Sequence, residues 1–334
     1  MAGHNAQGNT IAMHYNGSIW DTKTVPGAPD GFGDLWCAST NDVFAVCGNH
    51  IMHYDGTAWS PMSNGVLWSL RGTWGSSSGD VFAVGLKGTI LHNHGSSWGA
   101  MPSGVSSNLY GVWGSSSNNV FAVGDGGVVL RYNGSVWSAV DAGTTAPLRG
   151  VWGSSATDAF AVGDYGTIRH YDGSSWNTMS SGTERRLTAI WGRSSTDVYA
   201  VGEASTVLHY DGAGWNAMNV GLGSGLYPYC IWGSPDGQVF AAGYDGVILR
   251  YDGTHWNLMN SGTTNSLNGI WGTWSDNVFA VSNTAEILHY DGKHWNTRTM
   301  SVPGNSELRA IWGSSDNDVH VVGEYGIIIH GTRE

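Results

Sequence analysis

The chain has 334 residues, of which 41% are hydrophobic and 12% are charged, a composition that excludes an intrinsically disordered chain. Its net charge is −12 with only three lysines, and no basic stripe is visible, so nucleic acid and anionic lipid are excluded as partners. No apolar run approaches the roughly 18–20 residues of a membrane span, so we expect no membrane insertion.

The first predicted element, at 10–20, reads T-I-A-M-H-Y-N-G-S-I-W, and from there two tryptophans recur every 38 to 41 residues. The inner tryptophans are Trp36, Trp74, Trp113, Trp152, Trp191, Trp232, Trp271 and Trp312. The outer tryptophans, which close each copy, are Trp20, Trp59, Trp98, Trp137, Trp176, Trp215, Trp256 and Trp295. A fixed period of this length is typical of a repeat architecture.

The copy at 148–176 shows the elements of one repeat. We expect strands at 148–152, 158–162 and 167–171 and a fourth from Trp176, because each is a β-branched or aromatic run between turn residues. The Asp172-Gly173 pair predicts a tight hairpin between the last two strands. Four strands in about 39 residues are typical of a propeller blade, and no apolar period of helical length occurs.

The last predicted element, at 327–331, ends before a fourth strand. We therefore predict an all-β fold, a single β-propeller domain over 1–334 with eight four-stranded blades. The last blade would be built from about 308–331 plus the N-terminal strand at about 10–20, which removes exposed sheet edges. The third-strand pattern occurs nine times, so one terminal copy is redundant and the pairing copy stays open. Seven blades, or seven plus an irregular one, are the alternatives.

The unit W-G-S-S-x-x-D-V-F-A-V-G-x-x-G-T-I-L-H-Y-D-G-x-x-W resembles the repeats of secreted bacterial β-propeller proteins and, more distantly, BNR/Asp-box and kelch repeats. The resemblance covers about 7–331 and implies a propeller. The Asp-box has one more residue between its Asp and Trp, so sialidase activity is not implied. Residues 1–10 are polar, and the resemblance leads us to expect a secreted or periplasmic protein whose leader is absent from this sequence.

Residues that recur in every copy are predicted to hold the blades together. A histidine occupies one position of the third strand in seven copies (His14, His53, His92, His170, His209, His289 and His330), and we expect it to orient the following Asp-Gly turn. The cysteines (Cys37, Cys47 and Cys230) lack metal-site spacing and are predicted to be buried thiols. No phosphate-binding or zinc motif occurs, so we predict no metal and no cofactor.

Residues that vary at fixed positions are the candidates for ligand binding. The residue three before each inner tryptophan is variable and mostly polar: Gly33, Arg71, Tyr110, Arg149, Thr188, Tyr229, Asn268 and Arg309. If the first strand lines the axis, this ring faces the end of the central channel. Loops between the second and third strands open on the same face and contribute Asp164, Tyr165, Glu203, Asp245 and Glu324, and Trp68 lies on a connection between copies.

Three functions are consistent with this pattern. The first is a lectin-like binding propeller that holds a glycan or another polar or anionic small molecule at the channel mouth, where arginines are bidentate donors and aromatics stack. The second is a hydrolase or polysaccharide lyase that uses an Arg/Tyr/carboxylate cluster at the same place, although no motif identifies a catalytic residue. The third is a protein–protein scaffold. If these side chains form ordinary solvated loops, none of the three holds, and the oligomeric state stays open.

Overall fold

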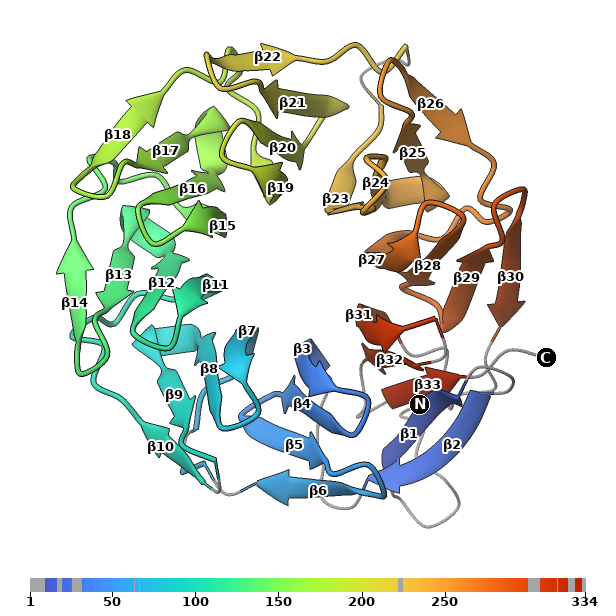
Figure 1. Cartoon of the computed structure of the whole chain (residues 1–334), viewed down its shortest axis with the longest axis horizontal. Coiled ribbons are helices and arrows are strands. Elements are labelled where there is room, and N and C mark those ends of the chain that lie inside the picture. Colours follow the sequence, from blue (N-terminus) through green and yellow to red (C-terminus); the bar gives the residue numbers. More distant parts are fainter. Residues whose placement is uncertain are drawn as a thin grey trace.

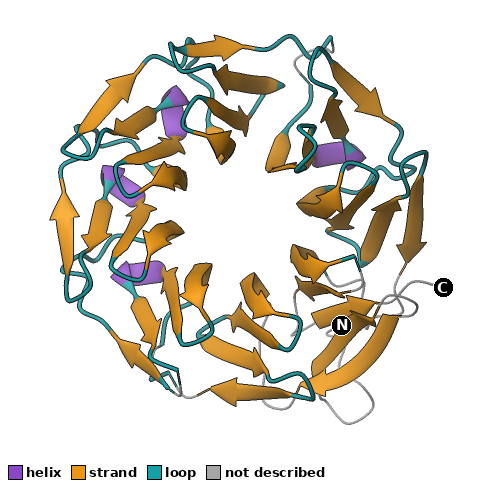
Figure 2. Ribbon diagram, viewed as in Figure 1, coloured by secondary structure: helices purple, strands orange, loops and turns teal. Residues whose placement is uncertain are grey.

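The computed structural model describes residues 10–16, 20–25, 32–62, 64–65, 67–95, 97–221, 225–299, 307–316, 318–323 and 328–331. These residues form a single all-β propeller, with sheets arranged radially around a central opening (Figure 1). Strands make up nearly the whole ring, and four short 3₁₀ helices lie between second and third strands (Figure 2). Tryptophan-containing repeats therefore do fold as propeller blades.

Seven blades are four-stranded sheets, numbered here in chain order, in which the first strand lies at the axis and the fourth at the rim (Figure 1). Blade 1 consists of β3 (Phe32–Ser39), β4 (Asp42–Cys47), β5 (His50–Tyr54) and β6 (Trp59–Met62), and blade 2 of β7 (Leu70–Ser77), β8 (Asp80–Gly85), β9 (Ile90–Asn93) and β10 (Trp98–Ala100). Blade 3 consists of β11 (Leu109–Ser116), β12 (Asn119–Gly124), β13 (Val129–Tyr132) and β14 (Trp137–Val140), and blade 4 of β15 (Leu148–Ser155), β16 (Asp158–Gly163), β17 (Ile168–Tyr171) and β18 (Trp176–Met179). Blade 5 consists of β19 (Leu187–Ser194), β20 (Asp197–Gly202), β21 (Thr206–Tyr210) and β22 (Trp215–Ala217), and blade 6 of β23 (Pro228–Gly233), β24 (Val239–Gly243), β25 (Ile248–Tyr251) and β26 (Trp256–Met259). Blade 7 consists of β27 (Leu267–Trp274), β28 (Asn277–Ser282), β29 (Glu286–Tyr290) and β30 (Trp295–Thr299).

The remaining sheet, called the closing sheet, has five strands in the order β1-β2-β33-β32-β31. Its members are β1 (Thr10–Asn16), β2 (Trp20–Val25), β31 (Leu308–Ser315), β32 (Asp318–Gly323) and β33 (Ile328–Gly331). The prediction of eight four-stranded blades is therefore not confirmed. The physical reason is the redundant repeat copy, because β1 and β33 both carry the third-strand pattern and both enter this sheet. The backbone of His320 in β32 is the register partner of both His14 and His330.

The core lies between blades, where aromatic rings from neighbouring repeats meet. Second strands are almost wholly buried, as in β16, where every residue after Asp158 is inaccessible. The outer Trp176 is 6% exposed and packs edge-on against Phe121 of the preceding blade, with ring centroids 5.4 Å apart. The same contact joins Trp215 to Phe160. A lone blade could not bury these rings, so stacking of repeats stabilises the fold.

At six junctions, from Trp36 over Gly75 to Trp232 over Gly272, the inner tryptophan lies over the glycine of the W-G pair in the next blade. A Cβ on Gly192 would lie 2.5 Å from the ring of Trp152, and one on Gly114 would lie 2.6 Å from the ring of Trp74. No larger residue fits beneath a rigid indole at that distance. The glycine of the W-G pair therefore recurs because of a contact between neighbouring blades, and not because of a turn within a blade.

The recurrent histidine has a different partner from the one we expected. His170 Nε2 lies 2.7 Å from Asp158 Oδ1 at the start of the second strand, and its ring stacks on Phe160. It does not bond the Asp-Gly turn, which closes through its own backbone amides on Asp172. Where arginine replaces histidine, an amide replaces the aspartate: Arg131 donates to Asn119 and Arg250 to Gln238. The pair is a fixed strand-to-strand bond of the blade.

Candidate functional site

Every variable position of the first strand is a β-bulge. In β15, Leu148 pairs with Gly163 and Gly150 with Val162, so Arg149 between them has no partner in the ladder. The same shift occurs at the other variable positions, Gly33, Arg71, Tyr110, Thr188, Tyr229, Asn268 and Arg309. A bulge re-aims one side chain and releases it from the in-and-out alternation of a strand. Variation at these positions therefore leaves the sheet intact.

First strands line a central cavity of about 440 Å³, and bulge residues lie on its wall. The lining residues from the predicted set are Arg71, Tyr110, Tyr229 and Arg309. Arg149 is absent from the lining because its side chain turns outward to a carboxylate. Thr188 and Asn268 also face the cavity, but their side chains donate to carbonyls of the next blade, those of Pro228 and Leu308. We call the end of the cavity where the first strands begin the channel mouth.

Arg149 is held in a network of ion pairs that runs across three blades. Its Nε and Nη2 donate to Asp164 Oδ1 and Oδ2 at 2.9 and 2.7 Å, and its guanidinium lies 4.7 Å above the centre of the Tyr110 ring. Arg186 Nε lies 3.1 Å from Asp164 Oδ1, and its Nη1 lies 3.5 Å from Glu203 Oε1. The bidentate face of Arg149, which we expected to bind an anion, is therefore occupied by Asp164.

The ion pairs hold this carboxylate in its charged form. The hydrogen bonds from Arg149 outweigh burial and keep the pKa of Asp164 below its ordinary value, while the same bonds raise the pKa of Arg149. Tyr110 extends the network by donating to Asp125 Oδ2 at 2.9 Å, where Asn108 also donates. A carboxylate fixed between two guanidinium groups is a weak proton acceptor, so the cluster is better suited to holding blades 3, 4 and 5 together.

Arg71 and Arg309 are the arginines on the cavity wall. Arg309 Nη2 pairs with Glu307 Oε2 at 2.7 Å. Arg71 is exposed and makes no ion pair or hydrogen bond with any other residue that the structure describes. A guanidinium without a protein partner keeps all of its donors available to an anion.

Asp34 follows the bulge of blade 1, at a position where every other copy has glycine, alanine or cysteine. It lies in the cavity wall next to blade 2, where Thr73 donates to its Oδ2 from the backbone N at 2.7 Å and from Oγ1 at 3.0 Å. Burial outweighs these bonds and raises the pKa of Asp34 to about 6. The channel wall thus contains a carboxylate that titrates near neutral pH.

The loops after the second strands carry strained residues at the same end of the ring. The 3₁₀ helices η1 (Leu86–Gly88), η2 (Asp125–Gly127), η3 (Asp164–Gly166) and η4 (Tyr244–Gly246) form these loops. Their central residues have positive φ, which is +57° at Tyr165 and +54° at Asp245. Tyr165 is 75% exposed and Trp68 is 49% exposed. The predicted site residue Glu324 lies outside the described residues.

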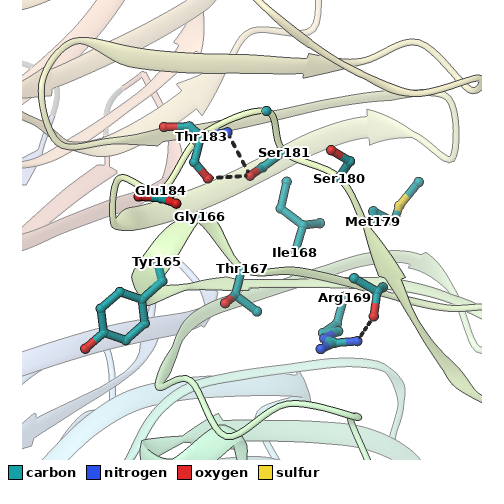
Figure 3. Close-up of a pocket in the computed structure, with 12 residues that line it drawn as sticks. Tyr165, Gly166, Thr167, Ile168, Arg169, Met179, Ser180, Ser181, Thr183 and Glu184 are labelled. Carbon is teal, nitrogen blue, oxygen red and sulfur yellow. Dashed lines mark hydrogen bonds between the residues drawn. The ribbon is translucent and has the colours of Figure 1, made fainter.

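A second cavity of about 440 Å³ lies beside Tyr165 on blade 4 (Figure 3). It is lined by the third strand, the fourth strand and the Ser181–Thr183 turn, with Tyr165 at one end and Arg169 at the other (Figure 3). Arg169 stands where other copies have leucine, methionine or isoleucine and donates to Thr178 Oγ1 and the Gly143 carbonyl. Burial lowers the pKa of Arg169. Its guanidinium joins blade 4 to the connection that precedes it.

Some residues of this face were missed in the sequence. Arg186 and Asp125 belong to the ion-pair network, and Tyr227 and Tyr244 lie half-exposed beside Tyr229. The signal was present, because each varies in a fixed frame like the residues that we selected. Among the described residues, no group of three or more His, Cys, Asp or Glu side chains could hold a metal ion. No helix in the described part of the chain has the length and apolar character to cross a membrane.

Comparisons with known proteins show the fold and leave the family open. No family model matches the sequence, and no curated protein matches it. Solved propellers do match. A structure described as YCF48 bound to D1 peptide is 16% identical, covers 97% of this chain and 100% of its own, and has a TM-score of 0.62. The WD40 propeller domain of Doa1 is 11% identical over 96% of each chain, with a TM-score of 0.64. The computationally designed Ika8 protein is 13% identical, covers 91% of this chain and 97% of its own, and has a TM-score of 0.75.

Proposed function

We propose that this chain is a binding propeller that holds the anionic group of a polar ligand at its channel mouth. The observation that carries the proposal is Arg71, an exposed guanidinium on the cavity wall with no partner among the described residues. Tyr110 and Tyr229 lie on the same wall and offer aromatic faces to the rest of a ligand.

Binding is better supported than catalysis at the cluster of Arg149 and Asp164. A hydrolase or lyase built on Arg149 and Asp164 would need a carboxyl group able to exchange a proton near neutral pH. The ion pairs lower the pKa of Asp164 and so remove it from that range. The D1 peptide in the YCF48 structure shows that one similar propeller binds a peptide. We therefore include a peptide beside the glycan among the ligand classes.

The first prediction tests Arg71 directly. A blocked acidic pentapeptide and a galacturonate trisaccharide are titrated into the full chain by calorimetry at low and moderate salt. We expect at least one to bind at millimolar or tighter affinity, more weakly at higher salt. Arg71→Ala should weaken that binding about tenfold or more, because a hydrogen bond to a charged group contributes about 1.5–3 kcal/mol.

Lys293→Ala is the matched control. Lys293 is exposed on the hairpin between third and fourth strands at the opposite end of blade 7, so its removal changes net charge equally without touching the channel mouth. Affinity should be unchanged in this variant. Absence of binding by both ligands, or equal affinity of Arg71→Ala and the parent chain, contradicts the proposed function.

A further inference from the structure

Blade 6 places tyrosines where every other copy of the repeat has a different residue. At the position of Tyr227, blades 2 to 5 have Ser69, Asn108, Pro147 and Arg186. At the position of Tyr244, the same blades have Leu86, Asp125, Asp164 and Glu203. Tyr227 and Tyr244 are 38% and 46% exposed, so neither ring is needed to fill a core. The copies serve as internal controls, and they mark this pair as specific to blade 6.

The backbone holds Tyr227 and Tyr244 side by side. Tyr244 N donates to the Tyr227 carbonyl at 2.9 Å. The preceding Gly243 is so close to that carbonyl that a Cβ would lie 2.0 Å from the oxygen. The ring centroids are 6.2 Å apart and the planes meet at 83°, so the tyrosines form two walls of a corner. A pre-formed corner loses little conformational entropy when it binds a ligand.

Negative charge surrounds this corner. Asp245 follows Tyr244, is exposed, and makes no ion pair with any charged residue in the described ranges. Burial raises the pKa of the neighbouring Tyr229 phenol, and the charges of Asp245 and Glu203 raise it further, so both carboxylates act on the same place. Glu203 is paired loosely, at 3.5 Å, with Arg186. The unpaired charge at this corner is therefore negative.

We propose that Tyr227, Tyr244 and Asp245 form an open aromatic cage that binds a cationic side chain, lysine or arginine, of a peptide. Cations are attracted to aromatic faces, and a carboxylate beside the rings adds Coulomb attraction. Two perpendicular rings with a carboxylate complement a compact cation, whereas a neutral sugar requires one broad flat face. Blade 6, which carries the cage, lies across the ring from blade 2, which carries Arg71 (Figure 1), and binding at the cage does not depend on anion binding there.

The test uses the blocked peptide Gly-Gly-Lys-Gly-Gly and the same peptide with an acetylated lysine, titrated into the full chain by nuclear magnetic resonance. We expect millimolar binding of the lysine peptide and at least threefold weaker binding of the acetylated one. Tyr244→Ala and Asp245→Asn should each weaken binding about two- to fivefold, the size of an exposed cation–π contact. Asparagine preserves the size of Asp245 and tolerates its positive φ.

Trp274→Ala is the matched control, because it removes an exposed aromatic ring from the hairpin between the first and second strands of blade 7, away from the cage. This variant should bind the lysine peptide as the parent does, and unchanged melting temperatures show that all variants are folded. Equal binding of both peptides, equal loss in Trp274→Ala, competition by a neutral oligosaccharide, or no binding overturns the cage. None of these outcomes bears on Arg71, whose ligands are acidic.

Discussion

Single residues decide how the channel wall responds to pH. Asp34 replaces the small residue that follows the bulge in other blades, and its carboxylate accepts both hydrogen bonds that Thr73 offers. The turn residue Asp172 has the opposite environment: it is exposed, and bonds from Ser174 and Ser175 lower its pKa. Burial therefore raises the pKa of Asp34, whereas hydrogen bonds lower the pKa of Asp172.

The pKa of Asp34, raised to about 6 by burial, predicts a pH dependence of stability. Between about pH 4 and 6 the folded protein keeps a proton that the unfolded chain has lost, so this residue lowers the free energy of unfolding as pH rises through that window. Asp34→Asn should therefore be more stable than the parent at about pH 7.5, with a smaller difference at about pH 4.5. Urea denaturation measures both.

Asp172→Asn is the control of opposite sign. Because its pKa is lowered in the folded state, ionised Asp172 stabilises the protein at neutral pH, and that contribution is lost as pH falls through the folded pKa. The asparagine variant should therefore be less stable than the parent at neutral pH. If Asp34→Asn also proves less stable at about pH 7.5, its hydrogen bonds outweigh its burial and the prediction is wrong.

At the scale of one element, the first strand joins scaffold and site. Its tryptophan contacts the next blade, and five of the eleven predicted site residues are its bulge residues: Arg71, Tyr110, Arg149, Tyr229 and Arg309. Strands and their order within a blade could be predicted from periodicity and turn residues. The bulges could not be predicted, because a one-residue shift in strand pairing does not change the composition of the strand. Without knowledge of the bulge, the outward turn of Arg149 toward Asp164 cannot be inferred.

The contact between the inner tryptophan and glycine gives a stability prediction at this scale. Gly192→Ala should lower the free energy of unfolding by about 1–3 kcal/mol, because its methyl group would lie 2.5 Å from the Trp152 ring. Gly99→Ala is the matched control, since no atom lies within 4 Å of a Cβ there. Chemical denaturation of both variants is the measurement. Equal stability would show that the indole moves aside without cost.

For the whole molecule, the ion-pair network matters because it connects separate repeats. Asp125, Arg149, Asp164, Arg186 and Glu203 alternate in sign from blade 3 to blade 5. The sequence predicted four-stranded units in a ring, but it could not identify this network, since its partners lie 15 to 24 residues apart and each alone is an ordinary surface charge. The five-stranded closing sheet was equally hidden, because redundancy shows that two copies exist and not that both pair.

The shortest ion pair of the network joins two residues of blade 4 and predicts a measurable coupling energy. A double-mutant cycle with Arg149→Ala and Asp164→Ala should give a coupling energy of about 1–2 kcal/mol, since the pair is bidentate and its side chains are only 25% and 13% exposed. Because the pKa of Asp164 is lowered, this coupling should be present at neutral pH and disappear as pH falls through the folded pKa of Asp164. Denaturant unfolding of the four proteins measures it. A coupling near zero at neutral pH would mean that solvent screens the pair.

The eight bulges also make the ring a natural framework for selection. Each bulge residue has no register partner in the second strand. The eight bulge residues include glycine, arginine, tyrosine, threonine and asparagine. A combinatorial library randomised at these codons would alter recognition while leaving the tryptophan contacts between blades unchanged. Evolution of a new specificity in such a chain requires a few point changes at one end of the channel, with no insertion and no repacking.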